Sequence, residues 1–242
     1  MTQHPSILPL KIENLDYEAG GKQLIKNINC EFNQGKRYLL LGPNGAGKTL
    51  LLRLCHGLLK PKSGKVIWSS GKDANPKHHQ AMVTQRPVML RRSAYANIDY
   101  ALSVRGVEKS LRPDMINAVI QRTGLTRVAN KLATVLSLGE QQRLAIARAW
   151  VLKPEVLFMD EPTGGLDVSV QAKLLDLLRG LVQNLGLSVV IVTHDLAVAR
   201  LLSHRLMVMK NGHVVESGLT DQVLDDPQDP YTQLLVSSIL QS

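Results

Sequence analysis

A glycine-rich segment carries the strongest chemical signal in the sequence. Residues 42–49 match the pattern G-x-x-x-x-G-K-[ST] of a phosphate-binding loop. Glycines let the backbone wrap around phosphate oxygens with its N–H groups pointing inward, and the helix expected from Lys48 adds the positive end of its dipole. Lys48 would neutralise the β- and γ-phosphates, and the Thr49 hydroxyl would ligate Mg²⁺. The predicted nucleoside triphosphate site comprises Gly42, Pro43, Asn44, Gly45, Ala46, Gly47, Lys48 and Thr49.

Two acids directly follow a second apolar segment. Val156–Met159 reads as a buried strand, and Asp160 and Glu161 come next. A buried strand places such residues at the carboxyl edge of a sheet, where open α/β sheets bind ligands. Asp160 is predicted to orient the Mg²⁺ shell, and Glu161 to polarise the attacking water as general base. An exposed acid pair before a proline turn is the alternative if the segment is taken alone.

Gln85 is the last residue of a predicted strand, and His194 directly follows another. Gln85 is predicted to contact Mg²⁺ or the attacking water, and His194 the γ-phosphate. A lone glutamine or histidine is more often a satisfied polar residue, so both assignments rest on their positions at strand ends.

Composition excludes several classes of protein. The chain has 242 residues, of which 44% are hydrophobic, as in a globular protein with a large core. Only 4% are aromatic, which argues against a stacking platform for single-stranded nucleic acid. The net charge of +9 is spread without long basic runs, which favours a solvated basic surface over a nucleic-acid site. Cys30 and Cys55 lack the spacing of a disulfide framework or zinc site.

No apolar run approaches the roughly 20 residues that cross a bilayer, and the first ten residues lack a secretory pattern. We therefore expect a cytoplasmic chain whose membrane role depends on a partner.

Strands and helices are expected to alternate, which predicts an α/β fold with a mostly parallel sheet covered on both faces. Two alternating segments joined by Gly20-Gly21 form an antiparallel N-terminal subdomain, and the segment from Arg86 to about Val135 is a helical insertion. Expected strands are Leu10–Tyr17, Leu24–Phe32, Arg37–Leu41, Val66–Ser69, Ala81–Gln85, Val156–Met159, Ser188–Thr193, Leu206–Met209 and Val214–Glu216. Expected helices are Lys48–Leu59, Glu140–Leu152, Val168–Asn184, Leu196–Leu202 and Leu234–Leu240.

The segment Leu136–Arg143, Leu-Ser-Leu-Gly-Glu-Gln-Gln-Arg, resembles the signature L-S-G-G-[QE]-x-Q-R of ABC transporter nucleotide-binding subunits. The resemblance covers nearly the whole chain. It implies a single ABC ATPase domain over 1–242, with a P-loop NTPase core at 1–85 and 153–242 and a helical subdomain at 86–152. It also implies adenine stacking on Tyr17.

The resemblance further implies a head-to-tail dimer of two copies. Each ATP would then contact Ser137, Gly139 and Glu140 of the other copy, and Asp167 would be a dimer contact. The sequence departs from the family pattern at three positions: Leu138 replaces a glycine, Gly164 stands where serine is usual, and Leu50 replaces a hydroxyl residue. We expect these departures to tune rate or affinity.

Different parts of the chain resemble two different subfamilies. Residues 85–93 are similar to ATPases of tungstate or molybdate importers, and residues 160–242 to the ATPase associated with carbon–phosphorus lyase and phosphonate uptake. The leading interpretation is the ATPase of an oxyanion importer, peripheral on the inner face of the membrane. Expected partners are permease subunits and a substrate-binding protein, with no nucleic acid; expected cofactors are ATP and Mg²⁺.

Alternatives remain open. One is a soluble ATPase acting on a phosphonate-metabolising complex, and a weaker one is a nucleic-acid-associated ATPase, which lacks a coiled-coil insertion or basic arm to support it. Val88–Leu90 is an apolar cluster beside Arg91 and Arg92. It predicts a permease-docking surface, with a buried helix start as its alternative.

Overall fold

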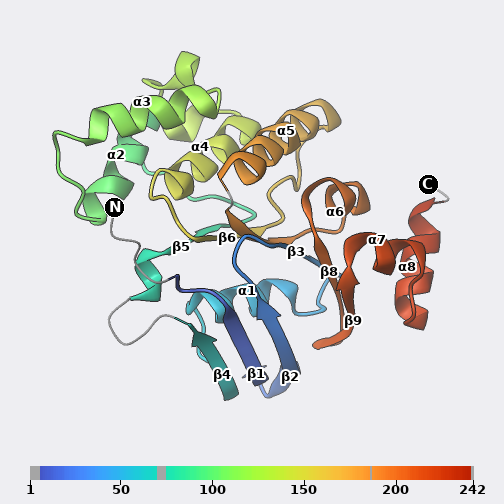
Figure 1. The fold of residues 1–242 in the computed structure, drawn as a ribbon. Coiled ribbons are helices and arrows are strands. Elements are labelled where there is room, and N and C mark those ends of the chain that lie inside the picture. The colour runs from blue at the N-terminus through green and yellow to red at the C-terminus, as the bar shows by residue number, and fades with distance from the viewer. Residues whose placement is uncertain (1–5, 70–74, 186, 241–242) are drawn as a thin grey trace.

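The structure, a computed structural model, describes residues 6–69, 75–185 and 187–240. The chain forms two sheets with helices packed around the larger one (Figure 1). The strands are β1 (Leu10–Ala19), β2 (Lys22–Phe32), β3 (Arg37–Leu41), β4 (Ser63–Trp68), β5 (Gln80–Val83), β6 (Val156–Asp160), β7 (Ser188–Val192), β8 (Arg205–Lys210) and β9 (His213–Leu219). The helices are α1 (Lys48–His56), α2 (Ala94–Val104), α3 (Arg112–Arg122), α4 (Leu138–Trp150), α5 (Val168–Leu185), α6 (Leu196–Leu202), α7 (Thr220–Asp225) and α8 (Pro230–Leu240), with short 3₁₀ turns η1 (Pro76–His78), η2 (Thr126–Val128) and η3 (Ala133–Val135).

The larger sheet has the strand order β5-β6-β7-β3-β8-β9. Strands β5, β6, β7, β3 and β8 run parallel, and β9 pairs antiparallel with β8 through the Asn211-Gly212 turn. The smaller sheet, β2-β1-β4, is antiparallel throughout. These findings confirm the predicted α/β class, the mostly parallel sheet and the antiparallel β subdomain.

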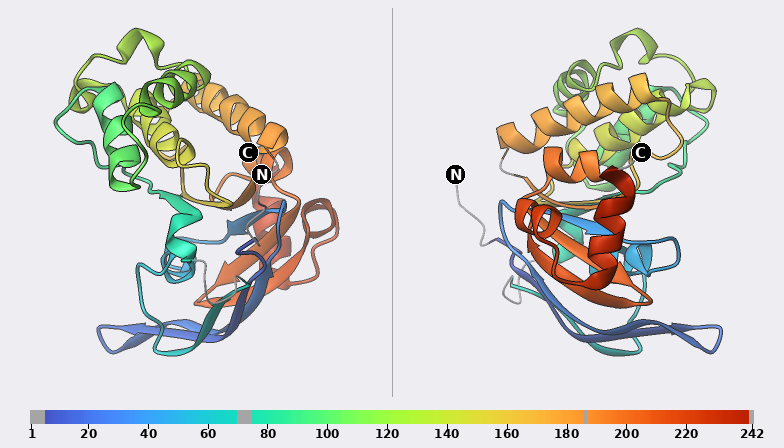
Figure 2. Two further views of the ribbon diagram at one scale, coloured as in Figure 1. Left: turned by 60° about the vertical axis from the view of Figure 1, so that its left-hand side comes forward. Right: turned by 90° about the vertical axis from the view of Figure 1, so that its right-hand side faces the viewer.

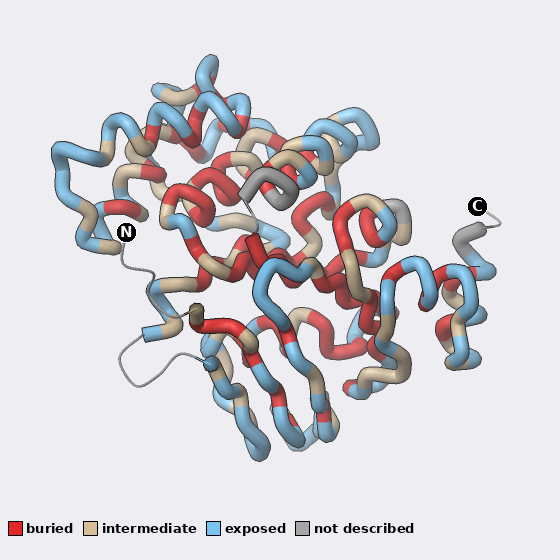
Figure 3. Tube along the Cα trace, viewed as in Figure 1, coloured by how far each residue is buried: buried red, intermediate tan, exposed pale blue. Residues whose placement is uncertain are grey.

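The larger sheet divides the core into two layers, because alternate residues of a strand point to opposite faces. In β3, Leu40 belongs to a cluster with α1 and the small sheet, whereas Leu39 and Leu41 belong to a cluster with α2–α6. Strands β6 and β7 are buried along their whole length, as Figure 3 shows in red at the centre of the molecule. The rigid centre of the sheet therefore fixes where β3 and β6 end.

The helical layer lies over the face of the large sheet that is remote from β1, β2 and β4, as the views of Figure 2 agree. Helix α2 begins at Ala94 rather than near the expected Arg86, because the Ser93 hydroxyl caps it by accepting a hydrogen bond from Ala96 N at 3.1 Å. The residues between β5 and α2 consequently form a loop, here called the 84–93 segment.

Several other boundaries differ from the expected ones for local reasons. Helix α1 ends at His56 instead of Leu59, because Gly57 adopts a left-handed C-cap. Helix α8 begins at Pro230 instead of Leu234, because the Asp229 carboxylate accepts a hydrogen bond from Tyr231 N at 2.8 Å. Helix α7 was not expected from the sequence.

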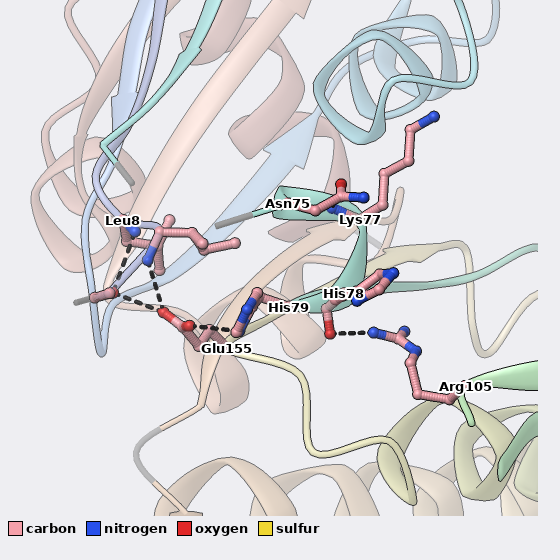
Figure 4. A network of polar contacts seen from close by, with 9 residues as sticks. Leu8, Asn75, Lys77, His78, His79, Arg105 and Glu155 are labelled. Carbon is pink, nitrogen blue, oxygen red and sulfur yellow. Dashed lines mark hydrogen bonds and ion pairs between the residues drawn. The ribbon is translucent and has the colours of Figure 1, made fainter. Parts of the chain in front are cut away.

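The N-terminal segment is attached to the amino edge of the large sheet through Glu155. One carboxylate oxygen accepts hydrogen bonds from Ser6 Oγ at 2.7 Å and Ile7 N at 2.9 Å. The other oxygen lies 2.9 Å from Nδ1 of His79 (Figure 4). This network ties the chain before β1 to the turn before β5, on the side opposite to the strand ends that carry the predicted site.

Candidate functional site

The glycine-rich loop connects the carboxyl end of β3 to the start of α1. Gly42, Gly45 and Gly47 all have positive φ values. A Cβ on Gly42 would lie 2.1 Å from Met209 O, so only glycine fits there. Lys48 is 5% exposed, and its ammonium donates to Gly42 O at 2.7 Å and Pro43 O at 2.9 Å. The loop thus holds a buried cation at the N-terminus of a helix, which is suited to phosphate.

Asp160 lies directly beside this loop. Its Oδ1 accepts a hydrogen bond from Thr49 Oγ1 at 2.8 Å across 111 residues of sequence. Burial raises the pKa of Asp160 against the opposing effects of the Thr49 bond and the nearby Arg53 and Lys48 charges. Burial also lowers the pKa of Lys48, although Glu161 and Asp160 favour its charged form. Both groups are therefore held in an environment that strengthens their interaction with an ionic ligand.

Glu161 occupies an unusual backbone conformation at the end of β6. Its φ is 44°, and its N–H donates to Val192 O at 2.8 Å. One carboxylate oxygen lies 3.2 Å from Nδ1 of His194, whose side chain is 69% exposed against 15% for Glu161. Left-handed backbone at a non-glycine residue costs free energy and is found preferentially at functional sites. The conformation aims the carboxylate toward the end of β7 and the histidine.

These residues surround one cavity of about 860 Å³. The phosphate-loop residues 42–49 line it together with Gln85, Glu161 and His194. Gln85 is exposed and lies two residues beyond the end of β5, not within a strand as the sequence suggested. The structure therefore brings together the predicted loop residues 42–49, Gln85, Glu161 and His194, with Asp160 bonded to Thr49 behind them.

Three residues that sequence reasoning missed also line the cavity. They are Leu24 on β2 and Tyr231 and Leu235 on α8. The Lys210 ammonium lies 4.6 Å from the centroid of the Tyr231 ring, which holds α8 against the end of β8. No functional role was expected for these positions from the sequence, and α8 was expected to begin only at Leu234.

Other predicted site residues lie away from this cavity. Tyr17 lines a separate cavity of about 310 Å³ with residues 18–21 and 60–62. Ser137 and Glu140 form a capping box at the start of α4, with Glu140 Oε2 accepting from Ser137 N at 2.8 Å. Asp167 caps α5 by accepting from Val170 N at 2.9 Å. Within one protomer, Ser137, Gly139, Glu140 and Asp167 do not line the phosphate-loop cavity.

The donor set fits a magnesium ion. Thr49 Oγ1 and Asp160 Oδ1 are hard oxygen donors 2.8 Å apart, beside a loop suited to phosphate. No group of three or more His, Cys, Asp or Glu side chains able to hold a metal occurs within 6–69, 75–185 and 187–240. Mg²⁺ characteristically uses one or two protein oxygens and completes its shell with phosphate oxygens and water.

The fold and this site together match an ATP-binding cassette. A family model described as "ABC transporter" matches residues 25–164. The chain belongs to the ABC transporter family, and it is the ATP-hydrolysing subunit of an ABC system. No helix in the described residues is long and apolar enough to span a bilayer.

Named relatives add detail. The chain is 46% identical over 251 residues to the phosphonates utilization ATP-binding protein PhnK of Escherichia coli (strain K12), covering 96% of this chain and 98% of the relative. Its structure is similar to that of cbiO1 from Clostridium perfringens, part of the ABC transporter complex cbiONQ, with a TM-score of 0.80, 30% identity and 91% coverage of both chains. It is also similar to the ATP-binding cassette MJ0796, a dimer bound to ADP and Pi, with a TM-score of 0.76, 28% identity, and 87% and 98% coverage.

Proposed function

We propose that this chain hydrolyses Mg²⁺-ATP between two head-to-tail copies and thereby energises an importer of an oxyanion, such as tungstate, molybdate or a phosphonate. The observation that carries the proposal is the single cavity that gathers the phosphate loop, Gln85, Glu161 and His194 from four separate parts of the chain. The proposal includes the division into a core at 1–85 and 153–242 and a helical subdomain at 86–152.

In the proposed mechanism the loop N–H groups and Lys48 bind the β- and γ-phosphates. Thr49, Asp160 and Gln85 would hold Mg²⁺, which supplies charge neutralisation for the developing negative charge on the phosphates. Glu161 orients the attacking water and accepts its proton. His194, 3.2 Å from that carboxylate, is within reach to steady it and to contact the γ-phosphate.

The dimer is supported by the residues that the cavity of one protomer does not use. Ser137, Gly139 and Glu140 lie at the start of α4. The capping box uses Ser137 N and Glu140 N, and the remaining first-turn N–H groups of a helix are suited to an anion. MJ0796 is a dimer bound to ADP and Pi. Partner copies would therefore place α4 against each other's nucleotide, with Asp167 at the contact and Tyr17 on adenine.

A membrane partner is supported by the similarity to cbiO1, which is part of a transporter complex. The chain would then lie on the cytoplasmic face of the membrane with permease subunits and a substrate-binding protein. The docking surface is the 84–93 segment. Val88 is 75% exposed there, whereas Met89 is half-buried against the helical core. The predicted cluster Val88–Leu90 is thus split, and Val88 is its exposed member.

One alternative is favoured by a specific observation. The near-full-length identity to a phosphonates utilization protein supports action on a soluble phosphonate-metabolising enzyme complex instead of a permease. The same relative favours a phosphonate over other oxyanions as cargo.

Affinity purification from detergent-solubilised native cells separates the two. If the chain energises a transporter, a polytopic permease should be recovered with it. Val88→Asp should abolish this recovery without changing ATP binding or melting temperature. The matched control is Leu219→Asp, an exposed apolar residue on the opposite edge strand β9, which should leave recovery intact. Recovery of a soluble lyase complex with no permease refutes the transport assignment.

A further inference from the structure

The 84–93 segment has no regular secondary structure, yet side chains of the helical layer hold its backbone. Gln142 Nε2 on α4 donates to Gln85 O at 3.0 Å. Arg148, also on α4, donates from Nη1 to Val88 O at 2.8 Å. A loop fixed in this way moves together with the helix that holds it, because the hydrogen bonds anchor its backbone carbonyls.

A third anchor comes from α2. The Asn97 side chain is fully buried. Its amide accepts from Leu90 N at 3.1 Å and donates to Leu90 O, Arg92 O and Ser93 O at 3.0–3.3 Å. The far end of the segment is therefore attached to α2, and Gln142 is the anchor at the end that enters the phosphate-loop cavity.

Gln142 is 0% exposed. Burying an amide costs free energy unless hydrogen bonds to its polar atoms compensate for the lost contact with water. Its Nε2 is used by Gln85 O, while its Oε1 has no hydrogen-bond partner among the described residues. A well-packed apolar side chain would avoid this unsatisfied oxygen, whose burial typically costs about 1–3 kcal/mol. The bond to Gln85 O is the interaction that Gln142 provides and an apolar residue would not.

The Gln85 side chain lines the phosphate-loop cavity together with Glu161. A Cβ on Gly164 would lie 3.5 Å from Gln85 Nε2 and 3.4 Å from Glu161 Oε2. The position of a Cβ on Gly164 is therefore within van der Waals contact distance of both the Gln85 amide and the carboxylate proposed as general base. A shift of the Gln85 carbonyl would move the amide along the cavity, and displacements of about 1 Å at a reacting centre can cost up to about 10²-fold in rate.

We propose that Gln142 is the positioning residue that holds Gln85 at the nucleotide site by anchoring its backbone to α4. This rests on the proposed function of Gln85 and Glu161. Because Ser137 caps the start of α4, the helix that would reach the partner's ATP also sets the place of Gln85 at its own ATP. Gln142 thereby joins the two nucleotide sites of the dimer mechanically.

A closely matched control exists in the same chain. Gln80 at the start of β5 is 4% exposed, donates from Nε2 to a backbone oxygen, His56 O, at 3.1 Å, and has an unpartnered Oε1. Gln80→Met and Gln142→Met therefore remove the same kind of bond from the same degree of burial. Only the second bond reaches Gln85.

The test measures ATP turnover, the Mg²⁺ concentration for half-maximal rate, and melting temperature for both variants. Gln142→Met should lower kcat by at least about tenfold and raise the Mg²⁺ requirement at least about threefold, with KM for ATP changed less than about threefold. Gln80→Met should shift melting temperature similarly and leave kcat and the Mg²⁺ requirement within about twofold of wild type.

A double-mutant cycle separates positioning from general damage. In a Gln85→Ala background, Gln142→Met should change kcat by less than about twofold, because the residue through which it acts is absent. Gln142→Glu, which keeps the side-chain length, is measured alongside. It should also lower kcat, and it provides the test if Gln142→Met does not fold. Equal kinetics for Gln142→Met and Gln80→Met overturn this inference alone, whereas a wild-type protein without ATPase activity overturns the proposed function with it.

Discussion

Replacing Glu161 by glutamine tests the proposed chemistry with little change of shape. Glutamine matches glutamate in size, and the backbone bond from residue 161 to Val192 O, at 2.8 Å, does not involve the side chain. The side chain is 15% exposed and lies 3.2 Å from Nδ1 of His194, a distance that an amide oxygen also tolerates. We therefore expect Glu161→Gln to fold with a melting temperature within about 2 °C of wild type.

The expected loss of rate follows from the role of the carboxylate. General-base catalysis contributes about 10²–10⁴-fold, or about 2.7–5.4 kcal/mol of barrier. Glu161 also places a negative charge near the Lys48 ammonium, so its removal reduces repulsion of an anionic ligand. Glu161→Gln should consequently lose at least about 10²-fold in kcat, while its affinity for ATP is unchanged or higher.

The assay combines phosphate release with size-exclusion chromatography in ATP and Mg²⁺. If closure normally ends with hydrolysis, the slow variant should accumulate as an ATP-bound dimer, whereas wild type elutes mostly as monomer. Glu31→Gln, an exposed glutamate 4.0 Å from Lys11 on the small sheet, is the control and should behave as wild type. Turnover above about a tenth of wild type would remove Glu161 from the role of base, and a monomeric variant saturated with ATP would refute the dimer.

Three further predictions follow from the site geometry. Lys48→Ala should weaken ATP binding about tenfold or more in calorimetry, because it removes a buried charge-assisted donor; unchanged affinity would mean that the site is elsewhere. Ser137→Arg should block ATP-driven dimerisation, whereas Leu138→Gly should change the ATPase rate by less than about tenfold; normal hydrolysis by Ser137→Arg contradicts the role of the signature. Asp160→Asn should abolish Mg²⁺-dependent turnover yet raise the melting temperature at pH 7 by a few degrees without nucleotide. Burial raises the pKa of Asp160 above its ordinary value of 3.8. Its charge therefore costs no folding free energy below pH 3.8, and the cost grows as the pH rises through the raised pKa. A melting temperature of Asp160→Asn below that of wild type at pH 7 contradicts this.

The strongest parts of the site were predictable because their signals are local. The phosphate loop must be glycine-rich where the backbone takes positive φ and where Met209 O leaves no space for a Cβ. The acid pair was predictable because the strand is apolar from Val156 to Met159 and must end at the carboxyl edge of the sheet. Both inferences need only neighbouring residues and the rules for parallel sheets.

The rest depends on contacts between distant segments. Tyr231 and Leu235 reach the cavity because α8 packs beside β8 through the Lys210–Tyr231 contact, which no local pattern encodes. The 84–93 segment was expected to begin the helical insertion, but Asn97 and Arg148 bind its carbonyls in a loop. For the same reason Met89 could not be recognised as half-buried while Val88 is exposed.

The three departures from the family pattern are compatible with the proposed mechanism because none removes a backbone N–H donor from the site. Leu138 is the first residue of α4, where the free backbone N–H groups, not the side chain, are the donors available to an anion. Its side chain is 44% exposed and packs toward Gly165 instead of covering the helix terminus. A serine Cβ in place of Gly164 would make ordinary van der Waals contacts with Glu161 Oε2 at 3.4 Å and Gln85 Nε2 at 3.5 Å, and a slightly closer one with Glu161 O at 3.3 Å. Leu50 packs against the core beneath the loop while lining the cavity, so it replaces a polar contact with burial. In the proposed mechanism the donors are therefore backbone N–H groups and a few anchored side chains, and one site residue, Gln85, is held through its carbonyl oxygen by Gln142 of α4.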